Sequence, residues 1–253
     1  MSALNPCLGI LDFQQEPSWV RSTPRPGSLM SSETYNLPVI IEEVPGATVD
    51  RVMRGDRALL PAYVASARKL VERGAVAITS NCGFAVRFQA PVAEAVNVPV
   101  ILSTLVLLPS MLRQYPESAM IGIGTFDSTS FAEDLLVGVD PADRQRVVVG
   151  GIEGGHNLRN AALGKATPPE QLEEDVAALI ARMLAAKPQI RALLFTCTNF
   201  PVITPAIRAR FGLPIYDITT CGRLTLESAV SAGLVHAPAS SARRRPNQQS
   251  TTE

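Results

Sequence analysis

Two cysteines stand where the sequence places a thiol just beyond a buried strand. Cys197 follows the apolar run Ala192–Phe195, and Cys82 follows shortly after the apolar run Ala75–Ile78. In open α/β folds, ligands collect at the carboxyl ends of the strands. A thiol at such a place could act as an acid or a base, because its pKa responds to its surroundings. We therefore take Cys82 and Cys197 as candidate catalytic residues.

The segments around the two cysteines repeat each other in register. Cys82 lies 17 residues before Pro99, and Cys197 lies 17 residues before Pro214. The first strand of each half precedes its cysteine by a similar distance, 72 residues in one half and 74 in the other. Such a repeat indicates two copies of one structural unit. A single cysteine would more simply be a buried packing residue, but two at equivalent strand ends favour a functional pair.

The elements that position these thiols follow from the apolar pattern. The predicted strands are 7–11, 39–44, 75–78, 98–102, 120–124, 146–149, 192–195 and 213–216. The predicted helices are 56–73, a short one near Pro91, one capped by Asp127 that runs to Leu136, one from a capping box at Thr167–Glu170 that ends at Pro188, one from Thr204, and 222–232. The irregular segments 14–38 and 150–164 lie between them.

Strands that alternate with helices predict parallel sheets with right-handed crossovers. We therefore expect an α/β fold of two pseudo-symmetric lobes, each a parallel sheet flanked by helices, with an active-site cleft between them. The expected boundaries are 1–103 plus 219–236 for lobe 1, which carries Cys82, and 104–218 for lobe 2, which carries Cys197. Residues 237–253 have no apolar pattern, which is typical of a disordered tail.

The composition excludes several other classes of protein. The 253 residues have 46% apolar content and no net charge, so the sequence offers no basic surface for nucleic acid or for a membrane. The longest apolar run is too short and too interrupted to span a bilayer, and the N-terminus lacks the pattern of a secretory signal. The four cysteines have no zinc spacing, so we expect no metal. Free thiols are typical of the reducing cytoplasm.

The cysteine motifs resemble those of a known superfamily. The segment Thr196–Pro201 (TCTNFP) is similar to the Cys-Thr-His-Tyr-Pro motif of the aspartate/glutamate racemase superfamily, which includes hydantoin racemases, arylmalonate decarboxylase and maleate isomerase. Cys82–Phe84 (CGF) stands where Cys-Asn-Thr is common, and the resemblance extends from about residue 9 to residue 234. Asn199 replaces a His of glutamate racemases, and Phe13 replaces a Ser, so the resemblance does not transfer a substrate.

The resemblance implies a racemase or epimerase that needs no pyridoxal phosphate or other cofactor. Cys82 and Cys197, on opposite sides of a planar intermediate, would move the α-proton of a small amino acid or a related carboxylic acid. The substrate-binding residues that the resemblance implies are Asp12, Asn81, Gly83, Thr125, Thr198 and Asn199. Weaker candidates are His156, in a Gly-rich loop, and Arg25, which could clamp a carboxylate. Homo-oligomers are common in the family.

Other functions remain open on the same scaffold. One alternative is a cis-trans isomerase or a decarboxylase that acts on a small dicarboxylate. Decarboxylases of the superfamily keep only one of the two thiols, so Cys82 argues against decarboxylation. A further alternative is a catalytically inactive binding protein, whose thiols would react slowly with iodoacetamide at neutral pH.

Overall fold

The computed structural model describes residues 6–15, 23–156 and 167–230. The expected tail, 237–253, lies outside these residues, as do parts of the two irregular segments (16–22 and 157–166). No helix in the described ranges is both long enough and apolar enough to cross a membrane.

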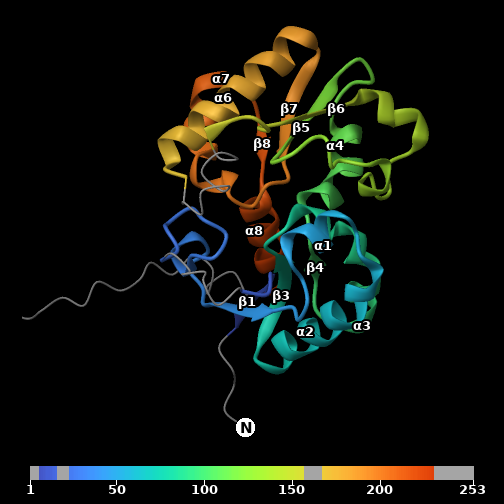
Figure 1. Ribbon diagram of the computed structural model, residues 1–253, viewed down its shortest axis with the longest axis vertical. Coiled ribbons are helices and arrows are strands. Elements are labelled where there is room, and N and C mark those ends of the chain that lie inside the picture. The colour runs from blue at the N-terminus through green and yellow to red at the C-terminus, as the bar shows by residue number, and fades with distance from the viewer. Residues whose placement is uncertain (1–5, 16–22, 157–166, 231–253) are drawn as a thin grey trace, which may run out of the picture.

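Two four-stranded parallel sheets form the centres of two lobes, as expected from the sequence (Figure 1). The strand order is β2-β1-β3-β4 in lobe 1 and β6-β5-β7-β8 in lobe 2, so the two sheets repeat one topology. The strands are β1 (Cys7–Asp12), β2 (Val39–Glu43), β3 (Ala75–Ser80), β4 (Val100–Ile101), β5 (Met120–Thr125), β6 (Val147–Gly151), β7 (Ile190–Phe195) and β8 (Ile215–Tyr216). All eight agree with the apolar runs in the sequence.

Helices flank both sheets (Figure 1). The α-helices are α1 (Val49–Met53), α2 (Leu60–Glu72), α3 (Gln89–Ala95), α4 (Leu108–Gln114), α6 (Pro169–Ala186), α7 (Thr204–Phe211) and α8 (Ile218–Ala229). Short 3-10 helices link them: η1 (Ser32–Thr34), η2 (Arg57–Leu59), η3 (Gly83–Phe88), η4 (Thr104–Leu107), η5 (Glu133–Leu135), η6 (Pro141–Arg146) and η7 (Phe200–Val202).

The helix α8 follows the last strand of lobe 2 but packs on the sheet of lobe 1. Figure 1 shows it in the middle of the molecule. Its buried residues Ile218, Cys221 and Leu226 share one apolar cluster with Leu8 and Ile10 of β1. Apolar side chains that leave water in this way supply most of the free energy that holds a helix on a sheet. The two lobes are therefore joined by packing as well as by the chain.

Two of the predicted helix starts were wrong. The capping box at Thr167 does not form, because the residue before α6 is Pro168, which has no side-chain acceptor; Pro169 does occupy the first turn. The helix α8 begins at Ile218, four residues before the prediction, because the Asp217 carboxylate accepts the N–H groups of Thr219 and Thr220. Gly222 therefore lies inside the helix.

The helix predicted after Asp127 is reduced to the 3-10 turn η5. The Asp127 carboxylate does accept the N–H group of Thr129 at 2.9 Å, as an N-cap would. It also accepts the hydroxyls of Thr129 and Ser130, each at 2.6 Å. Local hydrogen bonds of this kind hold the backbone in a turn and compete with a helix.

Among the described residues of lobe 2, the buried Arg146 side chain forms the largest set of hydrogen bonds. Its guanidinium donates to the carbonyls of Ala119, Leu112, Tyr115 and Pro116, at 2.9–3.2 Å, and pairs with Asp143 at 3.0 Å. The side chain is therefore tied to the end of α4 and to the start of β5.

We expect Arg146→Met to lower the free energy of unfolding by about 3 kcal/mol, because several buried carbonyls lose a charged donor. Urea unfolding followed by circular dichroism measures this loss. The matched control is Arg54→Met. Arg54 pairs with Asp50, but both side chains are about 70% exposed, so the cost should stay below about 1 kcal/mol. Equal losses in the two variants would contradict the role of Arg146.

Candidate active site

Cys82 lies two residues beyond β3, at the start of η3. The backbone is extended at Cys82 and then turns, which brings the N–H groups of Phe84 and Ala85 near the Cys82 sulfur, while the Ala85 N–H donates to the Cys82 carbonyl at 3.0 Å. The thiol is partly exposed. Backbone donors at the start of a helical turn favour an anion, so this position stabilises a thiolate relative to a bare buried one.

Cys197 occupies the matching position in lobe 2. It lies two residues beyond β7 and shortly before η7. The N–H groups of Asn199 and Phe200, two and three residues along the chain, act to lower the pKa of its thiol, as those of Phe84 and Ala85 do for Cys82. Each lobe therefore presents one partly exposed thiol beside the same pair of backbone N–H groups.

Both thiols hold their protons more tightly than an ordinary cysteine. Burial raises the pKa of Cys82 to about 11, although the N–H donors and the charge of Arg87 act in the opposite direction. Burial and, to a smaller extent, the charge of the Cys82 thiolate raise the pKa of Cys197 to about 12. The ionisation of Cys82 thus opposes the ionisation of Cys197.

The loops that carry the thiols touch each other across the lobes. A Cβ on Gly83 would lie only 2.3 Å from the carbonyl oxygen of Thr196, so no side chain fits at this position. The Thr104 hydroxyl, in the connection between the lobes, donates to the Phe195 carbonyl at 3.0 Å. These contacts fix the start of η3 against the end of β7.

A chain of hydrogen bonds crosses the same contact. The Asn81 side chain donates to the Asp12 carboxylate at 2.8 Å. The Thr198 hydroxyl lies 3.1 Å from the Asn81 carbonyl oxygen and 3.0 Å from the Asn81 side-chain oxygen, and donates toward both. Asn81 precedes Cys82 and Thr198 follows Cys197, so this chain links the ends of β1, β3 and β7 beside both thiols.

The sequence-predicted residues fall into two groups. The structure gathers Asp12, Asn81, Gly83, Thr198 and Asn199 around the thiols, through the contacts above. In this arrangement the Asn199 N–H faces the Cys197 sulfur, and the Thr198 hydroxyl is engaged by Asn81.

The remaining candidates lie elsewhere or on the edge of this group. Thr125 is buried at the end of β5, next to Gly124, whose carbonyl accepts the Thr196 N–H at 2.9 Å. His156 lies beside the first half of α6. Its ring is 3.7 Å from the Glu174 carboxylate, and its backbone N–H donates to the Asp175 carboxylate. Arg25 is exposed on a turn.

Two further residues belong to the site that the sequence did not single out. Tyr63 of α2 is buried against the ring of Phe88, and its phenol has a raised pKa, mainly from burial and then from the charges of Cys82 and Asp12. Arg87 of η3 is the cation that acts on Cys82. Tyr63 has the spacing of a core residue, so only the tertiary contact reveals it.

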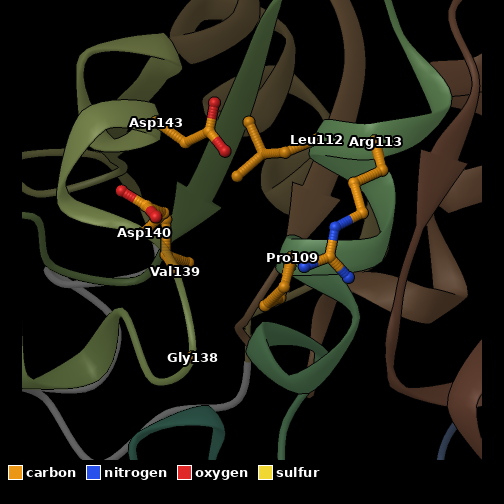
Figure 2. Close-up of a pocket in the computed structure, with 7 residues that line it drawn as sticks. All are labelled: Pro109, Leu112, Arg113, Gly138, Val139, Asp140 and Asp143. Carbon is orange, nitrogen blue, oxygen red and sulfur yellow. The ribbon is translucent and has the colours of Figure 1, made fainter.

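Two surface cavities of the described chain are lined by neither thiol. The one in Figure 2 has a volume of about 330 Å³ and lies in lobe 2, with Arg113 and Pro109 on one side and two aspartates on the other. Asp140 already caps the N–H of Ala142, and Asp143 already pairs with Arg146. Both aspartates of this cavity are therefore already engaged within lobe 2. No cluster of His, Cys, Asp or Glu in the described ranges could hold a metal ion.

Comparisons with known proteins agree with this architecture. No family model matches the sequence. Unliganded arylmalonate decarboxylase superposes with a TM-score of 0.53 at 15% identity, over 90% of this chain and 94% of that one. Glutamate racemase from Francisella tularensis, in complex with D-glutamate, superposes with a TM-score of 0.52 at 16% identity, over 93% and 85% of the two chains. These structures share the two-lobed fold.

Similarity in sequence points to a narrower group. Dimethylsulfoniopropionate lyase 3 of Emiliania huxleyi (strain CCMP1516) is 31% identical over 242 residues, which cover 88% of this chain but only 60% of that protein. A dimethylsulfoniopropionate lyase of Durusdinium sp. clade D is 31% identical over 206 residues, which cover 77% of this chain and 67% of that protein. The chain therefore belongs to the family of these dimethylsulfoniopropionate lyases.

Proposed function

We propose that this enzyme removes the proton next to a carboxylate group with its thiol pair, and that the reaction is the β-elimination of dimethylsulfoniopropionate or a close analogue. The observation that carries the proposal is the thiol pair at the contact of the lobes, with two backbone N–H groups near each sulfur that act to lower its pKa. The similarity to dimethylsulfoniopropionate lyases supports the choice of substrate.

The environment of the thiols suits a weakly acidic C–H bond. A thiolate with a pKa of about 11 or 12 is a stronger base than an ordinary thiolate. Its cost is desolvation, which a positive charge on the substrate offsets. A sulfonium group supplies that charge, and the same group is a good leaving group because it departs as a neutral sulfide.

The proposed step balances without a cofactor. One thiolate takes the proton from the carbon next to the carboxylate. The electron pair of that C–H bond forms a double bond to the next carbon, and the C–S bond to the sulfonium breaks. Its electron pair leaves with the sulfur as dimethyl sulfide, and acrylate remains. The thiol then returns its proton to water before the next cycle.

A racemase or epimerase of a small amino or carboxylic acid is the second candidate. The observation that favours it is the symmetry of the thiols, because proton removal and return on opposite faces need two equivalent groups. Both candidates begin with the same proton transfer. They differ in whether the carbanion-like state loses a leaving group or regains a proton.

An experiment in D2O separates the two candidates. Dimethylsulfoniopropionate should yield dimethyl sulfide, measured by gas chromatography of the headspace, and acrylate, measured by NMR. Single-enantiomer amino acids and hydantoins should keep their α-hydrogen and their configuration. Deuterium at the α-carbon of an amino acid, together with no release of dimethyl sulfide, would overturn the lyase proposal in favour of the racemase.

Loss of the thiol that acts as the base, in Cys82→Ala or in Cys197→Ala, should reduce kcat for dimethyl sulfide release by at least about 10²-fold, the scale of a lost acid or base. Cys221→Ala is the matched control, because Cys221 is also a free cysteine but lies on α8 and packs against lobe 1. It should keep activity near that of the wild type. Retention of activity in both site variants would remove the thiols from the mechanism.

Gly83→Ala tests the contact between the thiol loops. Its Cβ would meet backbone at 2.3 Å, so η3 must move away from Thr196. A misplacement of about 1 Å costs on the order of 10² in rate. We expect that loss in kcat with little change in the circular dichroism spectrum. The control is Gly212→Asn at the end of α7, a left-handed position with open space that asparagine tolerates; a similar loss there would show that the assay reports general instability.

A further inference from the structure

Arg87 makes an unusually complete set of contacts for a residue next to a catalytic candidate. Its Nε and Nη2 atoms donate to the two oxygens of Asp134 at 2.6 and 3.0 Å, in a fork that joins η3 to η5 in lobe 2. Its Nη1 atom donates to the Met53 carbonyl, at the end of α1, at 3.0 Å. The guanidinium thus ties η3 to two other segments at once.

The surroundings of Arg87 hold its side chain in one place. The side chain is only 13% exposed, and its guanidinium lies 5.7 Å from the centre of the Phe84 ring. Gly55 has a positive φ of 70°, and a Cβ there would lie 2.6 Å from the Arg87 side chain. Phe84 in turn meets Phe131 of lobe 2 edge to face, with ring centres 6.1 Å apart. These neighbours therefore fix the conformation of the Arg87 side chain.

We propose that Arg87 is a positioning residue for Cys82: it ties the Cys82 loop to lobe 2 through Asp134 and keeps a positive charge near the thiol. The inference rests on the proposed function of the thiol pair. Its consequence is that Cys82 ionises before Cys197, so the two thiols enter the reaction in different protonation states.

The charges around Cys82 support this order. Arg87, on its own element, favours the thiolate. Tyr63 from α2 is kept neutral by a raised pKa, and Asp12 at the end of β1 is bonded to Asn81. Cys197 is the thiol that faces Cys82 from lobe 2, and the Cys82 thiolate raises the pKa of Cys197. The positive charge of Arg87 therefore lowers the pKa of Cys82 and not that of Cys197.

The test is the pH dependence of alkylation by iodoacetamide, followed separately at Cys82 and Cys197 by peptide mass spectrometry of the full-length protein. The thiolate is the reactive form, so each midpoint reports the proton affinity of that thiol. In the wild type, Cys82 should react at a lower pH than Cys197. In Arg87→Met the loss of the cation should move the Cys82 midpoint to higher pH, which slows its alkylation at pH 8 by about 3–10-fold.

Two variants separate the effect of the Arg87 charge from the effect of the bridge between Arg87 and Asp134. Arg87→Lys keeps the charge but loses the fork, and Asp134→Asn keeps the charge of Arg87 but weakens the bridge. In both variants the pH midpoint of Cys82 alkylation should be no higher than in Arg87→Met. In Asp134→Asn it should also be no higher than in the wild type. If Arg87→Met does not fold, the double variant Arg87→Met/Asp134→Asn leaves no unpaired carboxylate, and its Cys82 midpoint should lie above that of Asp134→Asn, from which it differs only in the cation.

The proposal is overturned if the Cys82 midpoint is the same in Arg87→Met and the wild type, or if Cys197 reacts first in the wild type. The alkaline rise of kcat/KM for dimethyl sulfide release should shift with the Cys82 midpoint. Alkylation needs no substrate, so the two proposals fail separately. A protein that keeps this order of thiols but cleaves no dimethylsulfoniopropionate would refute the function and leave the role of Arg87 standing.

Discussion

The contact between Gly83 and the Thr196 carbonyl is the constraint on which the rest of the site depends. Main chain meets main chain there, with no side chain between them. The separation of the two thiol loops is therefore fixed by backbone geometry, which varies far less than a side-chain contact would. The bonds between Asn81 and Thr198 and between Arg87 and Asp134 extend this contact on the two flanks of η3. A site made by two lobes becomes in this way as rigid as a site made by one.

Local patterns were sufficient to predict the sheets. Strands such as β3 and β7 are short apolar runs buried on both faces, and such runs carry their own signal. Their order along the chain, with the repeated spacing around Cys82 and Cys197, led to the two-lobed fold. The helix ends were harder, because they depend on tertiary contacts. Gly222 resembles a helix boundary in the sequence, yet it lies inside α8, and a glycine stands there because the Tyr35 ring occupies the space of a side chain.

Apart from Asp12, which the family resemblance supplied, the site was predictable only where the residues adjoin a cysteine. Asn81, Gly83 and Thr198 are neighbours of the thiols in the chain, so a strand-end argument finds them. Tyr63 and Asp134 reach the site from distant segments, through burial and through a fork to Arg87. No spacing in the sequence announces such contacts. The sequence pattern did not predict the reaction either. The fold and the thiol pair are compatible with a carbanion-like state that loses a leaving group and with one that regains a proton.

The placement of α8 also sets an order of assembly during synthesis. Lobe 2 is continuous from β5 to β8, so it can close its core as soon as residue 216 has left the ribosome. The sheet of lobe 1 is made first, but the face formed by Leu8 and Ile10 is only partly covered, by residues such as Leu29 and Tyr35, until residues 218–229 follow. The lobe that is translated first is thus completed last, and its apolar face stays open to chaperones and to aggregation for the whole time that lobe 2 is being made.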